Sequence, residues 1–435
     1  MQRSLLASFA LTVALATGSS AQTPTWKPEF LGAPPPTWST VYTTAVNDAG
    51  VVVGNTYLSG WRRAWIASPS LELALLPLPL GATWSEVADV NSAGVAVGQV
   101  LLDDGSSRAI LWQPGSMGYD FLLLPTSPGG FIPFSATGIN DRGDVVGKLG
   151  VLGGSYYWNQ AEGVVQLTYT TFPKVPGDVN EQRQIVADTS RMDLDTFVLE
   201  ELGNPTGTTY GYMYTVLSNL NDAGECTGYA VTATSGWPYL PVRYSDGPLW
   251  KVFSNFPLNA AGAGGIAASG DTVFQLGIYG TYVYVNGVGS IGLSSLVDPA
   301  YPDWDISNSF MPAISRGGLL ACNGANGATG QAGIVLLTPL HFEDLGGAAR
   351  GALGDPVLSG FGSLEPGQPA RLRLASAAPG SLAFLAWSAS SVPFPLFGGV
   401  LHTNPVSFIV TLPTSGLGKF DLTFNWPAVP PGTTF

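Results

Sequence analysis

An internal repeat constrains the fold of this chain more than any other feature of its sequence. Four clear copies read TAVNDAGVVVG (44–54), ADVNSAGVAVG (88–98), TGINDRGDVVG (137–147) and SNLNDAGECTG (218–228). Three weaker copies read GDVNEQRQIVA (177–187), GGIAASGDTVF (264–274) and PAISRGGLLAC (312–322). The central positions of successive copies lie 40 to 49 residues apart, so the sequence predicts an array of similar small units.

Each copy has the pattern of a strand, a tight turn and a second strand. The residue before the Asn is apolar in all seven copies, and the one before that is small or polar, which is typical of a strand with one apolar face. Asn and Asp side chains bond to their own downstream backbone and Gly adopts the left-handed conformation, so Asn-Asp-Ala-Gly predicts a hairpin turn. The residues to which we assign this structural role are Asn47, Asp48, Gly50, Asn91, Gly94, Asn140, Asp141, Gly143, Asn180, Asn221, Asp222 and Gly224.

Two more strands follow in most copies, and the four strands together have the dimensions of a propeller blade. The third strand carries an aromatic residue, such as Trp65, Trp112 or Trp158. A sheet of this size cannot bury two apolar faces alone, but a ring of stacked sheets can. We therefore predict an all-β fold in which residues 22–340 form a seven-bladed β-propeller. Six or eight blades are the alternatives, because three copies are weak.

The repeat also resembles a known family, the HAF family of extracellular repeats. The resemblance lies in the Asn-Asp-Ala-Gly-x-Val-Val-Gly core and the later Ala-x-x-Trp strand, and it covers roughly residues 28–340. The His-Ala-Phe triplet of the family is absent, and Arg63-Ala64-Trp65 stands in its place in the first copy. The resemblance implies an extracellular setting and repetition, and it implies no reaction.

The last copy lacks a fourth strand of its own before the repeat ends. The segment 27–32, which precedes the first copy, ends in Phe30-Leu31-Gly32 and has the pattern of an unpaired strand. We predict that this N-terminal segment completes the seventh blade and so removes two exposed sheet edges.

The repeat stops near residue 341, and residues 341–435 have a different pattern. Strict alternation at 371–374 and further apolar runs predict a small β-sandwich-like module. This segment loosely resembles the accessory β-sandwich modules of bacterial exported proteins. Residues 430–435 have the pattern of a lead-in to one more strand, so we expect that strand to be missing or one sheet edge to stay open.

The N-terminus and the charge predict where the chain works. Arg3, the apolar run 5–16 and the small residues ending at Ala21 predict a signal peptide over residues 1–21, cleaved after Ala21, and therefore secretion or a cell-surface or periplasmic location. No other segment has the length of a membrane span. A formal net charge of −13 disfavours nucleic acid as a partner. Cys226 and Cys322 lie two blades apart, so we predict free thiols.

Motifs for catalysis are weak. The segment 287–292 matches GxGxxG, but it falls between strands of one repeat and favours a Gly-rich hairpin over a dinucleotide site. The two histidines, His341 and His402, lie outside the repeats, which disfavours a Ser-His-Asp triad and a Cys/His metal site. The loops at Asp103-Asp104 and at Asp193 lack the ligand spacing of a calcium loop. We expect no cofactor and no metal.

Two sets of residues remain as candidates for binding. Aromatic residues and one Arg in the variable loops suit stacking on sugar rings or docking of a protein, although packing between blades explains each of them equally well; they are Trp61, Arg62, Trp84, Phe131, Phe134, Trp237, Tyr239 and Trp304. Asp89, Asp178 and Asn219 share one column of the repeat and could line a central channel, where bonding to the backbone is the favoured role. We expect an exported, non-catalytic binding or surface-structural protein with a carbohydrate or protein ligand. The alternative is a propeller hydrolase or lyase that acts on polysaccharide through the channel carboxylates.

Overall fold

The computed structural model describes most of the propeller and the strands beyond it. It covers residues 25–339 except for 117, 151–153, 168–173, 206–211, 233–238, 246–248, 254–262, 276–279, 286–288 and 307–311. It also covers residues 357–425 except for 363–368, 376, 379, 388–390, 397–398, 404–407 and 415–419. The leader at 1–21 and the end of the chain at 430–435 lie outside the described residues.

The first three blades are four-stranded antiparallel sheets whose strands follow one another in chain order. Blade 1 consists of β2 (Trp38–Val46), β3 (Val52–Leu58), β4 (Trp61–Ser68) and β5 (Leu71–Leu75). Blade 2 consists of β6 (Ala82–Val90), β7 (Ala96–Leu102), β8 (Ser107–Gly115) and β9 (Gly118–Leu123). Blade 3 consists of β10 (Pro133–Ile139), β11 (Val145–Leu149), β12 (Gly154–Asn159) and β13 (Gly163–Leu167).

Blades 4 to 6 repeat this order, with shorter strands in blades 4 and 6. Blade 4 consists of β14 (Asp178–Val179), β15 (Gln184–Ala187), β16 (Ser190–Asp193) and β17 (Leu199–Glu201). Blade 5 consists of β18 (Tyr212–Leu220), β19 (Cys226–Thr232), β20 (Tyr239–Ser245) and β21 (Leu249–Val252). Blade 6 consists of β22 (Ala263–Ile266), β23 (Thr272–Gln275), β24 (Thr281–Val285) and β25 (Gly289–Gly292), followed by the 3-10 turn η2 (Leu293–Leu296).

Blade 7 joins the two ends of the repeat region. Its strands are β26 (Trp304–Asp305), β27 (Ala313–Ile314), β28 (Leu320–Asn326), β29 (Gln331–Pro339) and the N-terminal β1 (Trp26–Gly32). β1 pairs antiparallel with β29, in register from Trp26 opposite Pro339 to Phe30 opposite Val335. The N-terminal segment therefore supplies the outer strand of the last blade, in the place predicted from the sequence.

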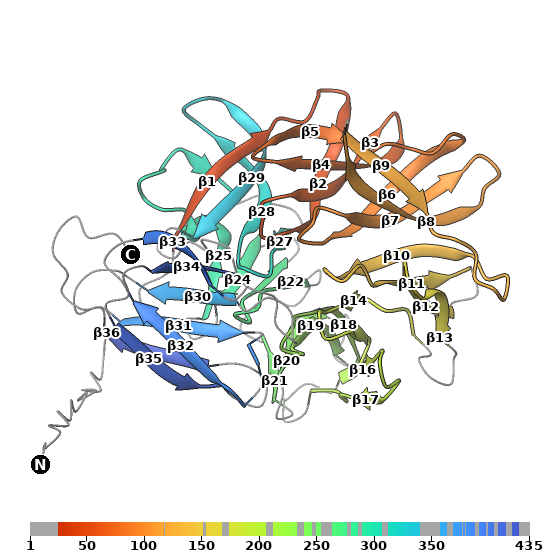
Figure 1. Cartoon of the computed structure of the whole chain (residues 1–435). Helices are drawn as coiled ribbons and strands as arrows, with labels where there is room; N and C mark the ends of the chain where they lie inside the picture. Colours follow the sequence, from red (N-terminus) through yellow and green to blue (C-terminus); the bar gives the residue numbers. More distant parts are fainter. Residues whose placement is uncertain are drawn as a thin grey trace, which may run out of the picture.

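The seven sheets form a ring around a central channel, so the predicted seven-bladed β-propeller is confirmed (Figure 1). The C-terminal strands, blue in Figure 1, lie outside this ring. They form one three-stranded and two two-stranded antiparallel sheets, made of β30 (Val357–Gly362), β31 (Pro369–Ala375), β32 (Leu382–Trp387), β33 (Ser391–Leu396), β34 (Gly399–Thr403), β35 (Phe408–Pro413) and β36 (Phe420–Asn425). In the described part of the chain, no helix has the length and apolarity that a bilayer crossing requires.

The apolar core lies between the blades, because each of the seven seams holds its own cluster of buried side chains. Trp112 and Ile66 pack between blades 1 and 2, and Tyr156 packs between blades 2 and 3. Trp65 packs between blades 7 and 1, and Phe274 contacts Phe253 across the seam between blades 5 and 6. Each thin sheet is thus covered on both faces only when its neighbours are present, which accounts for the apolar second strands of the repeat.

Details of the turns and cysteines agree with the sequence analysis. Gly50, Gly143 and their counterparts in the other copies have the left-handed φ that the turn requires, for example +75° at Gly50. Both cysteines are buried thiols, and no disulfide joins them. The residues 289–292 of the GxGxxG match form β25, which pairs with β24 in a hairpin.

Removal of the closing strand should destabilise the whole ring. Deletion of residues 22–36 removes β1, takes Trp26 and Leu31 out of the clusters at both faces of blade 7, and exposes the edge of β29. We expect the melting temperature of the propeller, measured by differential scanning calorimetry, to fall by at least about 5 °C. Deletion of residues 22–24 is the control and should leave the transition unchanged. An unchanged transition in the longer deletion would contradict closure by β1.

Candidate functional site

The repeated Asn of each hairpin turn bonds its own turn and also the next blade. In blade 1, Oδ1 of Asn47 accepts hydrogen bonds from the amides of Ala49 and Val51, at 3.0 and 2.9 Å. Its Nδ2 donates to the carbonyl of Asn91 in blade 2, at 2.8 Å. The amide group therefore fixes the turn with its oxygen and ties two blades together with its nitrogen.

This inter-blade contact recurs in the same direction around most of the ring. Asn91 donates to the carbonyl of Asn140, Asn140 to that of Asn180, and Asn180 to that of Asn221, at 2.9 to 3.1 Å. Asn221 donates to the carbonyl of Ala267 in blade 6, at 3.0 Å. We call these five contacts the Asn ring. All five Asn side chains are buried, so each bond also satisfies a carbonyl that water does not reach.

Blades 6 and 7 carry Ala267 and Ser315 where the other copies have Asn, and the Asn ring stops there. A backbone bond from the amide of Ala268 to the carbonyl of Arg316, at 2.9 Å, joins these two blades instead. The amide of Gly317 then donates to Oδ1 of Asp48, at 2.5 Å, and links blade 7 to blade 1.

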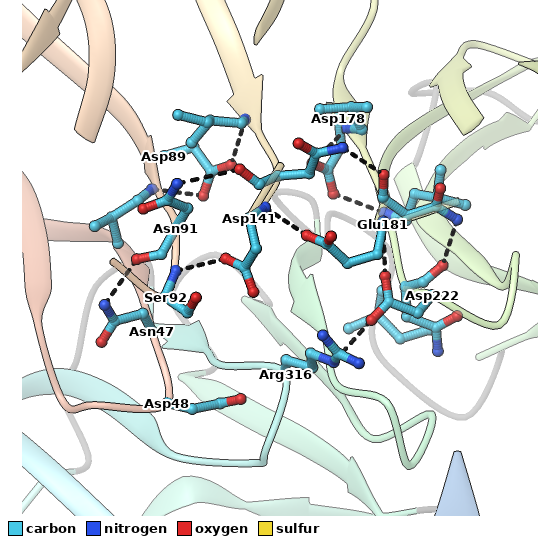
Figure 2. Close-up of a pocket in the computed structure, with 18 of the residues that line it drawn as sticks. Asn47, Asp48, Asp89, Asn91, Ser92, Asp141, Asp178, Glu181, Asp222 and Arg316 are labelled. Atoms are coloured by element: carbon cyan, nitrogen blue, oxygen red, sulfur yellow. Dashed lines mark hydrogen bonds and ion pairs between the residues drawn. The ribbon is translucent and has the colours of Figure 1, made fainter. Parts of the chain in front are cut away.

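A second ring, made of carboxylates, runs beside the Asn ring at the same mouth of the channel (Figure 2). The amide of Ser92 donates to Asp141, that of Asp141 to Glu181, and that of Glu181 to Asp222. The guanidinium of Arg316 pairs with the other oxygen of Asp222, at 2.7 Å. Each acidic side chain thus accepts the backbone amide of the preceding blade, which explains why an acidic residue so often follows the repeated Asn.

Asp89 and Asp178 occupy the predicted channel column and hold the backbone of the next blade. Asp89 accepts the amide of Val90 at 2.7 Å and that of Ile139, in blade 3, at 2.9 Å. Asp178 accepts the amides of Val179 and Leu220 at 2.7 and 2.9 Å. Both oxygens of each carboxylate are therefore occupied, which is the bonding to backbone that the sequence analysis favoured. Asn219, the third member of the column, donates to the hydroxyl of Ser218.

Burial changes the acidity of these two carboxyl groups. It raises the pKa of Asp89 to about 6, although the two amide hydrogen bonds act in the opposite direction. Burial, and after it repulsion from Asp89, raises the pKa of Asp178 well above its ordinary value. The pair therefore resists ionisation of both members together.

Two small chambers lie along the channel, and Val46, Ile266 and Ile314 border both of them. The chamber at the mouth formed by the Asn turns has a volume of about 160 Å³, and the other one about 120 Å³. The apolar residue before each repeated Asn borders the first chamber in all seven blades; these residues are Val46, Val90, Ile139, Val179, Leu220, Ile266 and Ile314. Both chambers fall below the roughly 300 Å³ at which ligand pockets begin.

The predicted loop residues that the structure describes lie on the face of the ring opposite the Asn turns, which we call the loop face. This face holds the starts of the inner strands and the tips of the hairpins between second and third strands. Trp61, Phe131 and Tyr239 are exposed there. The others contact neighbours: Arg62 lies over the ring of Trp84 at 5.7 Å and pairs with Glu86, Lys148 lies over Phe134, and Trp304 contacts Phe30. The structure thus brings together Arg62 and Trp84, whereas Phe134 and Trp304 contact residues of their own blades. Trp237 lies outside the described residues.

A third cavity, of about 410 Å³, lies between blades 7 and 1 and was not predicted from the sequence. Its walls include Trp38, Thr40, Asp305 and Asn323. Trp38 is the first residue of its inner strand, two positions before the repeat column of Trp84, and an aromatic residue near this end of the strand in both copies is the signal that could have pointed to it.

The acidic loops considered for calcium are solvated turns. Asp104 accepts hydrogen bonds from Ser106, and Asp193 from the amides of Asp195 and Thr196. Across the residues that the structure covers, no three His, Cys, Asp or Glu side chains are arranged to hold a metal ion.

The fold and this arrangement define the class of the protein as a seven-bladed β-propeller held together by side-chain bonds between blades. No model of a known family matches the chain, and a search of curated proteins found no relative. Among solved structures it is similar to virginiamycin B lyase from Staphylococcus aureus, with 12% identity, a TM-score of 0.44, and coverage of 72% of this chain and 100% of that one. It is similar to an oligogalacturonate lyase in complex with manganese, with 9% identity, a TM-score of 0.44, and coverage of 74% and 99%. It is also similar to TolB from Acinetobacter baumannii, with 11% identity, a TM-score of 0.25, and coverage of 77% and 75%. Likenesses this distant say nothing about activity.

The Asn ring can be tested by an isosteric substitution. Asn91→Asp keeps the oxygen that accepts the amide of Val95 but replaces the donor to the carbonyl of Asn140 with an anionic oxygen. We expect the free energy of unfolding at pH 7, measured by urea denaturation, to fall by about 2 to 3 kcal/mol, because a buried carbonyl loses its donor and faces a charge. Ser92→Ala, at the exposed neighbour, should change it by less than about 0.5 kcal/mol. Equal stability of the two variants would show that the Asn ring contributes nothing.

The raised pKa of Asp89 predicts a particular dependence of stability on pH. A carboxyl group whose pKa is higher in the folded state binds its proton more tightly there, so it stabilises the fold at low pH. This contribution is complete below the unfolded pKa of about 4 and is lost as the pH rises through about 6. We expect the free energy of unfolding of the wild type to fall more between pH 4 and pH 7 than that of Asp89→Ala, which also relieves the repulsion on Asp178. The free energies of unfolding are measured by urea denaturation across this pH range. If they depend on pH in the same way in the wild type and in Asp89→Ala, the raised pKa of Asp89 is contradicted.

Proposed function

We propose that this chain is an exported binding protein that presents the loop face of its propeller to a carbohydrate or protein ligand. The observation that carries the proposal is the state of the channel carboxylates. Each of the six that border the chamber at the Asn turns accepts a backbone amide; these residues are Asp48, Asp89, Asp141, Asp178, Glu181 and Asp222. Groups engaged in this way hold blades together.

The loop face offers a different chemistry. Exposed aromatic rings at Trp61, Phe131 and Tyr239 can stack on sugar rings or pack against apolar side chains of a protein. They are carried by loops on a rigid scaffold, which is where binding residues concentrate. The leader pattern at residues 1–21 and the resemblance to HAF repeats support an extracellular location, and the net charge of −13 suits a soluble secreted chain.

One observation favours the alternative, a polysaccharide hydrolase or lyase. Asp89 and Asp178 have raised pKa values and influence each other, as a pair of catalytic carboxyl groups would. Against this, the chambers that they border have volumes of about 160 and 120 Å³, too small for a polysaccharide segment. Their oxygens are also occupied by amides of the next blade.

A glycan array probed with the secreted chain tests the proposal. We expect binding to at least one glycan or surface protein, and we expect Phe131→Ala on the loop face to weaken it at least fivefold. Phe197→Ala is the matched control, because Phe197 is equally exposed but lies in the hairpin between β16 and β17, on the face of the Asn turns. We also expect polysaccharides incubated with the secreted chain to release no new reducing or unsaturated ends. Release of such ends by the wild type, lost in the Asp89→Ala/Asp178→Ala double variant, would establish the enzyme instead.

A further inference from the structure

The cavity between blades 7 and 1 differs from the channel chambers in size and in lining. Its volume of about 410 Å³ lies within the ordinary range for ligand pockets. The half-buried ring of Trp38 forms one wall, with Val41 and Ile334 beside it. The exposed carboxylate of Asp305 and the amide of Asn323 border the same space.

A local distortion of the first inner strand accompanies this cavity. The register between β2 and β3 shifts between Ser39 and Tyr42, and Thr40 lies within the shift with a φ of +48°. A β-branched residue rarely adopts the left-handed conformation, and such strain concentrates at binding sites. The strained backbone at Thr40 therefore indicates that this wall of the cavity has a role other than strand pairing.

Comparison with the next seam shows what the distortion changes. Asn55 of blade 1 pairs with both the amide and the carbonyl of Val87 in blade 2, at 2.9 and 3.0 Å. Asn323 is the residue in the same column of the last copy, and its Nδ2 donates at 2.6 Å to the carbonyl of Val41, inside the register shift. The Asn at this repeat position thus closes the seam between blades 1 and 2 in the first copy, whereas in the last copy it borders an open cavity between blades 7 and 1.

We propose that this cavity binds one uncharged hexose unit of a glycan, with the sugar ring stacked on Trp38. This inference rests on the proposed function and deepens it. An apolar plate beside a carboxylate, an amide and a hydroxyl matches a ligand that has an apolar ring face and hydroxyl groups around its rim. Asp305 accepts hydrogen bonds from two sugar hydroxyls, and the hydroxyl of Thr40 lines the same space.

The lining disfavours charged ligands. Among its described residues no basic side chain occurs, and Asp305 would repel an anionic sugar or a phosphate. Cations such as methylated ammonium groups are held by cages of several aromatic rings, whereas Trp38 is the single aromatic residue among those that line this cavity.

Titration of the full secreted chain with short oligosaccharides tests the inference. The probes are neutral trisaccharides of glucose, mannose, galactose and N-acetylglucosamine, with trigalacturonate as the anionic and a trimethyl-lysine peptide as the cationic comparison. Tryptophan fluorescence and saturation-transfer NMR report binding. We expect at least one neutral trisaccharide to bind, with affinity reduced at least tenfold in Trp38→Ala, reduced severalfold in Asp305→Ala, and largely kept in Trp38→Phe. Phe197→Ala, on the face of the Asn turns, is the control and should bind this probe like the wild type.

The outcomes separate this inference from the broader proposal. Asp305 is exposed, so Asp305→Ala remains informative even where Trp38→Ala lowers the melting temperature. Binding that is lost in Phe131→Ala but kept in Trp38→Ala and Asp305→Ala would overturn the cavity as the site and leave the loop face as the binding surface. Trp38-dependent binding of the cationic or anionic probe alone would overturn the ligand class. Failure of every neutral trisaccharide to bind at millimolar concentration would overturn the inference, while the glycan array decides the proposed function separately.

Discussion

The hydrogen bond from the repeated Asn to the carbonyl of the next blade is the interaction on which the ring depends. Each blade is too thin to have a core of its own, and its apolar side chains are buried only against its neighbours. Apolar packing alone leaves neighbouring sheets free to slide, because it has little directionality. A buried amide that bonds its own turn and the adjacent carbonyl sets the height of one blade against the next, so turn formation and blade stacking become one event.

This construction determines where function can lie. The inner ends of the strands are filled by the Asn ring, by carboxylates that accept backbone amides, and by the seven apolar side chains that border the first chamber. The carboxylates at the channel mouth accept backbone amides of neighbouring blades, which gives this acidic cluster a structural role. The loop face carries the exposed aromatic rings, and the seam between blades 7 and 1 contains the cavity of ligand size.

The repeat allowed the class of fold, the blade number, the closing strand and the left-handed glycines to be predicted, because each follows from local patterns and from the need to cover apolar faces. Asn47 was predicted to fix its own turn, and its bond to Asn91 was not foreseen, since a single copy contains no information about the neighbouring blade. Asp89 was predicted to line the channel, and it borders both chambers. Its bond to the amide of Ile139 depends on how blades 2 and 3 lie against each other, and residue spacing contains no information about that. The cavity beside Trp38 is bordered by Thr40, whose left-handed conformation is not expected of a Thr residue.

The position of that cavity follows from how the ring is closed. The Asn ring ends at Ala267, and Ser315 replaces the Asn of the last copy, so among the described residues the Asn-to-carbonyl bond does not recur on either side of blade 7. Blade 7 also takes its outer strand from the other end of the repeat region and is held to blade 1 by the bond from Gly317 to Asp48. The seam between blades 7 and 1 is also crossed by side-chain bonds from Thr43 to the carbonyl of Ala321 and from Asn323 to the carbonyl of Val41, and the cavity lies beside the second of these. A ligand bound in the cavity would contact blade 1 and blade 7 together and so strengthen the closure of the ring.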